Sequence, residues 1–385
     1  MFPENILKIL EDKMKKYDVA AYIWPAYTGR EPRTHMFWPE GIGEWQSVKN
    51  MYQVMPNKPE GYTWDRKPLW GYVDEADPYV MEMEIEAALD HGVNVFIYDW
   101  YWYDNRPFLE QCLNDGFLKA KNHDKMKFYL MWANHDANTL WNRDLSHEKT
   151  LIWEGTVNFE QFKTIGKRWI DQYFHLPCYY KIDGKPVVSI YDIANFINGM
   201  GGLEEAKKAL LWFREEVKKS GLPGVHLQLV KWGKKQLNLS GVDGSTMEYT
   251  HLEAFKALDM DSCTHYQFVH FSDMNRDYTE IVKDAYEEWD KTTSAIDKEY
   301  FPHVSIGWDN NPRYVAFANR VTTNNPPEEF KKVLEKAKEH VDKYNKTPLI
   351  TVNSWNEWTE TSYLEPDTLY GYGYLEAIRD VFLEK

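Results

Sequence analysis

Short apolar runs alternate with longer amphipathic stretches along this sequence, and that alternation leaves few folds open. Eight runs have the length of a β-strand, and most are apolar at nearly every position, which is typical of parallel strands buried on both faces. The eight runs are 19–24, 93–100, 126–134, 185–192, 224–232, 242–250, 301–310 and 348–356. Between them, apolar residues recur at three- and four-residue intervals and predict helices over 79–91, 107–122, 159–174, 203–219, 278–297, 327–344 and 369–384.

Strands and helices that alternate about eight times over 385 residues predict an α/β fold, a single (β/α)8 or TIM barrel spanning 1–385. The alternative is a doubly wound open sheet, which usually carries a Gly-rich phosphate turn after its first strand. Here the first strand is followed by WPAYTGREPR, which contains no GxGxxG. We therefore favour the barrel, with long insertions after the first, third and sixth strands, at about 28–78, 134–158 and 251–300.

The charge and hydropathy of the chain exclude several partners. The net charge of -15 and the pI of about 5.3 argue against nucleic acid and anionic membrane surfaces. The mean hydropathy is -0.64, and no apolar run approaches the roughly 20 residues of a membrane span. The three cysteines, Cys112, Cys178 and Cys263, are far apart and are expected to be buried apolar residues rather than a disulfide or metal framework.

The N-terminal 18 residues are amphipathic and charged throughout, and they lack the apolar core of a signal peptide. We therefore expect a cytoplasmic protein as numbered, or a periplasmic or secreted one if a signal peptide was removed.

Large aromatic and polar side chains gather where the predicted strands end. In a barrel these ends converge on one mouth, where active sites are built. Aromatic residues make up 16% of the chain, with 17 Trp and 26 Tyr. Flat apolar rings with polar tips suit a cleft that stacks sugar rings and hydrogen-bonds their hydroxyls. We predict that substrate is bound by Trp24, Tyr27, Asp99, Trp100, Trp102, Trp132, Asn134, His135, Tyr191, Lys231, Glu248, Tyr249, Trp308, Asp309, Asn356 and Glu365.

Several of these residues could instead have purely structural roles. Trp24 and Trp100 could fill the top of the barrel, and His135 could form a hydrogen bond to a local backbone group. Lys231 would fit a solvated rim, and Asp192, after the fourth strand, the cap of the next helix. Asp99 differs from these, because it follows the apolar VFIY directly and would be buried without a partner.

Two glutamates after the last predicted strand, Glu357 and Glu360, stand three residues apart. On a continued strand they would face opposite sides, whereas on a turn their Cβ atoms would lie about 5–6 Å apart on one face. Two carboxyls at such a place are what glycoside hydrolysis requires of an acid and its partner. We find no HExxH, no metal-spaced His/Cys cluster, no P-loop and no GxSxG, and we expect neither a metal nor a cofactor.

Six blocks of the sequence carry a family resemblance, four to one family and two more to a branch related to it. The segment TVNSWNEWTETSYLEPD resembles the block that ends the barrel in glycoside hydrolase family 99 and in the related WbsX-like domains. AAYIWPAY, HGVNVFIYDWYW and YYKIDGKPVVSIYD resemble earlier blocks of that family, while MWANHD and WDNNPR are more similar to the WbsX-type branch. The resemblance implies a (β/α)8 barrel and a retaining endo-α-mannosidase-like reaction through a 1,2-anhydro sugar. It implies that Glu357 is the base that assists the substrate's 2-hydroxyl and that Glu360 is the acid.

The sequence departs from the mannosidases at two positions: Thr359 stands where they carry His, and Thr361 where they carry Gly. The WbsX branch is often labelled glycosyltransferase. Three hypotheses follow: a glycoside hydrolase acting on an oligo- or polysaccharide, a glycosyltransferase using a nucleotide sugar, and a non-catalytic glycan-binding barrel. The strand-end carboxylates and the lack of a basic cluster for a diphosphate favour hydrolysis, and leave the sugar, the linkage and the oligomeric state open.

Overall fold

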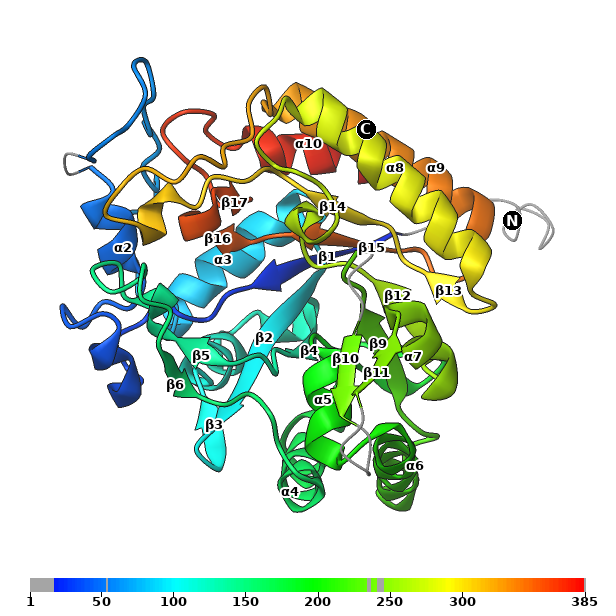
Figure 1. Ribbon diagram of the computed structural model, residues 1–385. Coiled ribbons are helices and arrows are strands. Elements are labelled where there is room, and N and C mark those ends of the chain that lie inside the picture. The colour runs from blue at the N-terminus through cyan, green and yellow to red at the C-terminus, as the bar shows by residue number, and fades with distance from the viewer. Residues whose placement is uncertain (1–16, 53–54, 234–236, 241–245, 384–385) are drawn as a thin grey trace.

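The computed structural model describes residues 17–52, 55–233, 237–240 and 246–383. Its core is a curled parallel sheet surrounded by helices (Figure 1). Seven strands are paired in the order of the chain, and each lies parallel to its neighbours. They are β1 (Asp18–Ile23), β2 (Val95–Tyr103), β4 (Lys127–Trp132), β8 (Lys185–Ile190), β9 (His226–Val230), β12 (Ser262–Thr264) and β15 (Leu349–Asn353), with β15 beside β1.

The seventh position of the barrel is filled by two short strands in one segment, β13 (Glu299–Tyr300) and β14 (His303–Ser305). β13 pairs with β12, and β14 pairs with β15. Between them, Phe301 donates its backbone N–H to Cys263, and the carbonyl of Pro302 accepts from Thr351. Because one segment joins both ends of the strand order, the sheet closes on itself, and the predicted (β/α)8 fold is confirmed.

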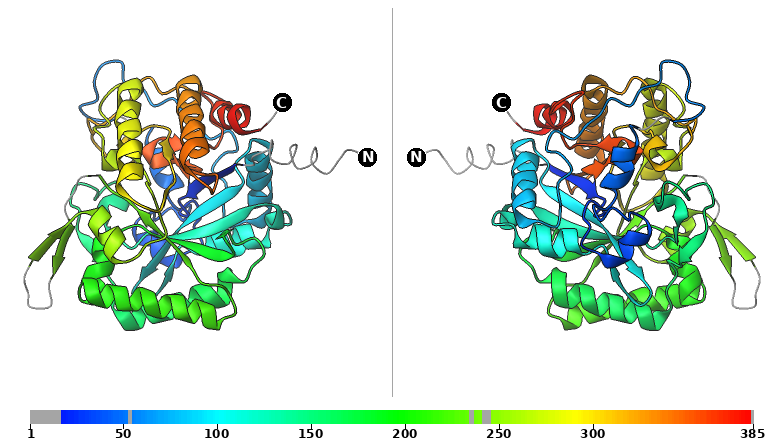
Figure 2. Two further views of the ribbon diagram at one scale, coloured as in Figure 1. Left: turned by 90° about the vertical axis from the view of Figure 1, so that its right-hand side faces the viewer. Right: turned by 90° about the vertical axis from the view of Figure 1, so that its left-hand side faces the viewer.

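Amphipathic helices cover the outside of the sheet (Figure 2). In α9 (Pro327–Tyr344) the buried residues Phe330, Val333, Leu334, Ala337 and Val341 form the stripe that three- and four-residue spacing predicts. The other long helices also lie close to their predicted positions. They are α3 (Pro78–Asp90), α4 (Phe159–Trp169), α6 (Leu203–Lys219), α8 (Tyr278–Ala295) and α10 (Gly373–Phe382). Three shorter helices lie outside the predicted ranges: α2 (Trp45–Asn50), α5 (Ile193–Met200) and α7 (His251–Ala257).

The prediction of the sixth barrel strand at 242–250 is wrong. In the structure, β11 (Thr246–Tyr249) pairs antiparallel with β10 (Leu237–Ser240) in a hairpin that projects from the barrel (Figure 2). The sixth strand is β12, which falls inside the stretch that we assigned to an insertion. β12 does not show the hydrophobic pattern of a buried strand, because two of its three residues, Ser262 and Thr264, are polar although fully buried. The Ser262 hydroxyl is hydrogen-bonded to His226 Nε2, and the Thr264 hydroxyl donates to the carbonyl of Phe301.

The helix predicted over 107–122 is also wrong. The chain turns through Asp104 and Asn105, both with positive φ, and β3 (Arg106–Phe108) pairs back onto β2. One π-helical turn, Cys112–Gly116, and one 3-10 turn, Phe117–Lys119, replace the helix. The apolar residues of this segment, whose spacing suggested a helix, instead lie in a β-hairpin and two single helical turns.

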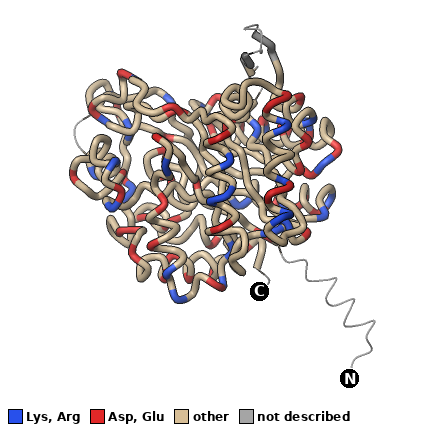
Figure 3. Tube along the Cα trace, turned by 90° about the horizontal axis from the view of Figure 1, so that it is seen from below, with Lys and Arg blue, Asp and Glu red and all other residues tan. Residues whose placement is uncertain are grey.

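Charged residues of both signs are interspersed along the chain in the view of Figure 3. Several opposite charges stand three residues apart on helices, such as Glu205 with Lys208 and Glu215 with Lys218. Exposed pairs of this kind contribute little to the stability of the fold, because solvent screens their charges. None of the helices in the described part of the chain combines the length and the apolar character needed to cross a membrane.

Candidate active site

A cavity of about 340 Å³ lies where the barrel strands end. The end of every barrel strand, or the loop that follows it, contributes to its wall. The lining residues are Trp24, Asp99, Tyr101, Met131, Ala133, His135, Asp136, Asn138, Leu140, Trp141, Tyr191, Trp232, Tyr266, Arg313, Glu357 and Glu360. Of the predicted site residues, the structure thus brings together Trp24, Asp99, His135, Tyr191, Glu357 and Glu360.

Glu357 and Glu360 occupy a tight hairpin after β15. β16 (Asn356–Glu357) pairs antiparallel with β17 (Ser362–Tyr363), and a 3-10 turn, Trp358–Glu360, connects them. The guanidinium of Arg313 donates from Nη2 to Glu357 Oε1 at 2.6 Å and from Nη1 to Glu360 Oε1 at 2.7 Å. The chain therefore turns, and the two carboxyls share one face.

Thr361 closes this turn in the left-handed conformation, with φ of 55°. A β-branched residue is strained there, and the mannosidases of the resemblance carry Gly at the position. Two hydrogen bonds hold the Thr361 hydroxyl: it donates to the carbonyl of Asp309 at 2.8 Å and accepts from Trp64 Nε1 at 2.9 Å. These bonds offset the strain that glycine would avoid.

A third acid, Asp99, joins the pair through a tyrosine. The Tyr266 hydroxyl lies 3.0 Å from Asp99 Oδ2 and 3.2 Å from Glu357 Oε2. Asp99 is 3% exposed, and its Oδ1 has no hydrogen-bond partner among the described residues. Burial raises the pKa of Asp99 well above its ordinary value. The cavity therefore contains three neighbouring carboxyls, and Arg313 is the only arginine or lysine among its lining residues.

The two glutamates are tuned by opposing effects. Burial raises the pKa of Glu357, and the charge of Glu360 raises it further, while Arg313 opposes both. Burial also raises the pKa of Glu360, against the charge of Arg313 and its hydrogen bond. Two close carboxyls that interact in this way titrate as a pair. Burial keeps protons on the pair to a higher pH than free glutamates would hold them, which suits carboxyls that exchange protons in acid–base catalysis.

Aromatic rings form the remaining wall of the cavity. The ring of Trp24 stands edge-on to Tyr101, with centroids 5.5 Å apart, and Trp141 packs beside both. Across the cavity, Tyr191 meets Trp232 edge-on at 5.0 Å. These rings line the cavity, and aromatic faces are the kind of surface on which sugar rings stack.

Three predicted tryptophans lie on the opposite face of the sheet. Trp100 and Trp102 alternate with Asp99 and Tyr101 along β2, and successive strand residues point to opposite sides. Trp100 Nε1 donates to Glu110 at 2.8 Å, outside the cavity. Trp132 likewise stacks on Phe162 of α4, whereas its neighbours Met131 and Ala133 line the cavity.

Four other predicted residues are held in contacts outside the cavity lining. Tyr27 accepts from the backbone N–H of Trp358, and Asn134 bonds the backbone of Asp192, which itself caps α5 as expected. Trp308 does not line the cavity, and Asp309 accepts from the Tyr62 hydroxyl at 2.7 Å.

Lys231, Asn356 and Glu365 are also buried away from the cavity. Lys231 forms an ion pair with Glu288 of α8. Asn356 Nδ2 donates to the carbonyl of Trp24 at 2.9 Å, and Glu365 accepts from Trp358 Nε1. Tyr249 and Glu248 belong to the projecting hairpin; the side chain of Glu248 lies outside the described residues, and Tyr249 does not line the cavity.

Sequence reasoning missed several residues of the site. Arg313 stands in the WDNNPR block that carried the resemblance, but it was not singled out. Tyr101 is two residues beyond Asp99, so the alternation along β2 places both on one face. Tyr266 follows β12 and was missed together with that strand, and Trp141 lies in the insertion after β4.

Known proteins resemble this chain in sequence and in fold. The model of the family described as Glycosyltransferase WbsX matches residues 19–378. Two relatives, both called uncharacterized protein WxcX and both from Xanthomonas campestris pv. campestris, are 23% identical over 354 residues. The match covers 90% of this chain and 47% of each relative, so the chain spans about half the length of the curated relatives it matches.

Solved structures share the fold at low sequence identity. The GH99 endo-alpha-mannosidase from Bacteroides thetaiotaomicron is 14% identical, with a TM-score of 0.54, over 94% of this chain and 95% of that one. A structure described as a glycoside hydrolase-like protein is 13% identical, with a TM-score of 0.61, over 96% of this chain and 95% of that one.

Proposed function

The chain belongs to the WbsX family, and on that premise we propose that it hydrolyses glycosidic bonds in an oligo- or polysaccharide, with Glu357 and Glu360 as its catalytic carboxyls. The observation that carries the proposal is the buried pair itself. Both carboxyls lie in a cavity walled by tryptophan and tyrosine, and one arginine bridges them. Glycosidases use two carboxyl groups of this kind, one as acid and one as base or nucleophile, in an aromatic cleft large enough for a sugar.

The roles of the two carboxyls follow the resemblance to family 99. Glu357 takes the proton of the substrate's 2-hydroxyl while that oxygen attacks the anomeric carbon, and Glu360 protonates the leaving oxygen. Water then opens the 1,2-anhydro ring, and the two glutamates exchange their roles. The hydrogen bonding supports this assignment: Glu360 Oε2 is buried and has no hydrogen-bond partner among the described residues, so it is free to carry the proton, whereas both oxygens of Glu357 are held, by Arg313 and Tyr266.

A glycosyltransferase is the second candidate, because the family description names that activity. A nucleotide-sugar enzyme needs cations or a metal for the diphosphate. Arg313, the cation of the described cavity, already pairs with Glu44, Glu357 and Glu360. The surplus of carboxylates favours hydrolysis of a neutral or basic glycan.

Replacement of Glu360 by Gln tests the proposal. Removal of a general acid lowers the rate by about 10²–10⁴-fold for a poor leaving group and much less for a good one. We expect Glu360→Gln to lose hydrolysis of natural glycans, found by screening mannans and other polysaccharides, and to retain more activity on aryl glycosides.

Glu335→Gln is the matched control, since Glu335 is exposed on α9. It should behave as wild type in product release and in thermal unfolding. Full activity of a folded Glu360→Gln protein on a glycan that wild type cleaves would refute the assignment.

A further inference from the structure

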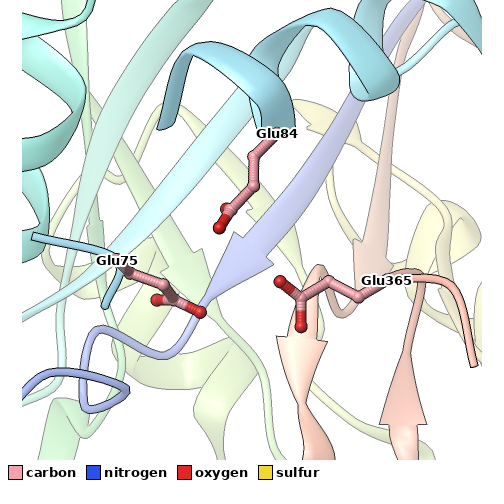
Figure 4. A group of neighbouring side chains, drawn as sticks. All are labelled: Glu75, Glu84 and Glu365. Atoms are coloured by element: carbon pink, nitrogen blue, oxygen red, sulfur yellow. The ribbon is translucent and has the colours of Figure 1, made fainter. Parts of the chain in front are cut away.

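Three glutamates that are distant in the sequence meet behind the hairpin of the candidate active site (Figure 4). Glu75 precedes α3, Glu84 belongs to α3, and Glu365 follows β17. One carboxylate oxygen of each lies within 4.8 Å of the others, and the side chains are 0%, 0% and 3% exposed. None of the three lines the cavity, so they form a second group of acids, which we call the glutamate cluster.

Each member of the glutamate cluster accepts an N–H from a residue beside Glu357. Trp355 Nε1 donates to Glu84 Oε2 at 2.9 Å. Asn356 Nδ2 lies 2.9 Å from both oxygens of Glu75. Trp358 Nε1 donates to Glu365 Oε2, so the cluster holds both flanks of the catalytic hairpin from behind.

Part of the hydrogen-bonding capacity of the cluster is unused. Glu84 Oε1 and Glu365 Oε1 are buried and have no hydrogen-bond partner among the residues that the structure describes. Figure 4 shows the three carboxyl groups turned toward a common space. In the described part of the chain, the ion pairs of the barrel involve other acids, such as Glu288 with Lys231. These two unpaired carboxylate oxygens indicate that a hydrogen-bond donor or a cation occupies the space between them.

A cation accounts for these observations better than protons do. Buried, uncompensated negative charge costs several kcal/mol per group and has to be neutralised. The N–H groups of Trp355, Asn356 and Trp358 favour the ionised form of the carboxyls that they contact. A set of carboxylate oxygens is the ligand type of hard divalent ions.

We propose that Glu75, Glu84 and Glu365 bind one hard divalent cation, Ca²⁺, Mg²⁺ or Mn²⁺, that fixes the catalytic hairpin in place. The ion contacts no residue that lines the cavity and takes part in no chemical step. The proposal stands apart from the proposed function, because a transferase or a binding protein with this hairpin would need the same support.

Metal analysis of the purified full chain tests the site. We expect about one equivalent of Ca²⁺, Mg²⁺ or Mn²⁺ in wild type, and roughly tenfold less in Glu84→Gln, which keeps the shape of the side chain but loses the charge. Glu335→Gln, the exposed control, should keep the wild-type metal content. A chelator should lower the melting temperature of wild type, and one of the three ions should restore it.

Thermal unfolding of wild type tests the proposed cation site even if Glu84→Gln does not fold. Glu365→Gln is a second variant for the metal analysis. Metal-free wild type whose melting temperature does not rise with millimolar CaCl₂, MgCl₂ or MnCl₂ would overturn the proposal and leave shared protons as the neutralising agent. Zinc or copper as the retained ion would also overturn it. The same would follow if folded Glu84→Gln kept as much metal as wild type.

Discussion

Arg313 is the residue on which the electrostatics of the candidate active site depend most. Its guanidinium contacts Glu357, Glu360 and Glu44, and its side chain is 10% exposed. A planar guanidinium donates to two carboxylates in a fixed geometry that lysine does not reproduce. Arg313 therefore sets both the position of Glu357 and Glu360, the two carboxyls that we propose as catalytic, and the balance of their charges.

Replacement of Arg313 by Gln should shift the pH dependence of hydrolysis. Arg313 lowers the pKa of Glu357 and of Glu360 against the effect of burial. Without it both pKa values rise, so both limbs of the profile of kcat/KM against pH should move to higher pH. At neutral pH we expect roughly 10–100-fold lower kcat/KM.

The control for this measurement is Arg106→Gln, because Arg106 pairs only with the exposed Asp104. Its profile should superimpose on that of wild type. An unshifted profile for active Arg313→Gln would show that the arginine does not govern the ionisation of the pair.

Single side-chain directions could be predicted from the sequence only where the local geometry was known. Along β2 the alternation of a strand separates Asp99 and Tyr101 from Trp100 and Trp102, and recognising the strand is enough to make that assignment. The contacts of Arg313 with Glu357 are different, because 44 positions separate the two residues. No local pattern brings them together.

At the scale of elements, a buried ion pair ties strand β9 to helix α8. Lys231, just after β9, pairs with Glu288 of α8, and His265 Nε2 lies 3.5 Å from the same carboxylate. Burial alone would raise the pKa of Glu288, but the nearby imidazole of His265 and the charge of Lys231 bring it down to about 2. This link lies beneath the loops that carry Trp232 and Tyr266 into the cavity.

Lys231→Met should destabilise the protein by about 3–5 kcal/mol, because it leaves the Glu288 carboxylate buried without its cation. In wild type, the depressed pKa of Glu288 contributes stability that is present above the unfolded value and is lost as the pH falls toward about 2. The free energy of unfolding from a denaturant titration at neutral pH measures the loss.

The double variant Lys231→Met, Glu288→Gln is the companion measurement, since it removes both charges. It should recover much of the lost stability. Equal destabilisation in the single and the double variant would mean that packing, rather than the unpaired charge, causes the effect.

Elements with an apolar pattern were predictable, and polar ones were not. The stripe of α9 and the apolar runs of β1, β2 and β15 appear where the periodicity places them. β12 has only three residues, and two of them are polar side chains that bond inside the barrel. Its strand character comes from pairing with β9 and β13, which no local signal reveals.

The whole molecule combines an acidic chain with an acidic cavity. The net charge is -15, and the cavity contains Asp99, Asp136, Glu357 and Glu360 around Arg313. An anionic ligand therefore approaches against a repulsive potential, and Arg313, the arginine that lines the cavity, is already paired with carboxylates. A neutral glycan meets no such barrier.

Nucleoside diphosphates should accordingly fail to stabilise the protein. With millimolar UDP or GDP, with and without Mg²⁺, we expect no rise in melting temperature, because a ligand raises stability only if it binds the folded state. A neutral oligosaccharide that is a substrate should raise the melting temperature of the inactive Glu360→Gln variant. A clear rise with one diphosphate would favour the transferase instead.

The sequence by itself determined the barrel and the presence of two glutamates three residues apart after its last strand, since both depend on local spacing, but it left open whether the two carboxyls share a face. The tertiary structure alone decided what surrounds that pair. Closure through 299–305 brings Arg313 and Tyr266 to Glu357, and the packing of α3 behind the hairpin brings Glu75 and Glu84 to Glu365. These contacts join segments far apart in the chain, so they exist only once the sheet has closed.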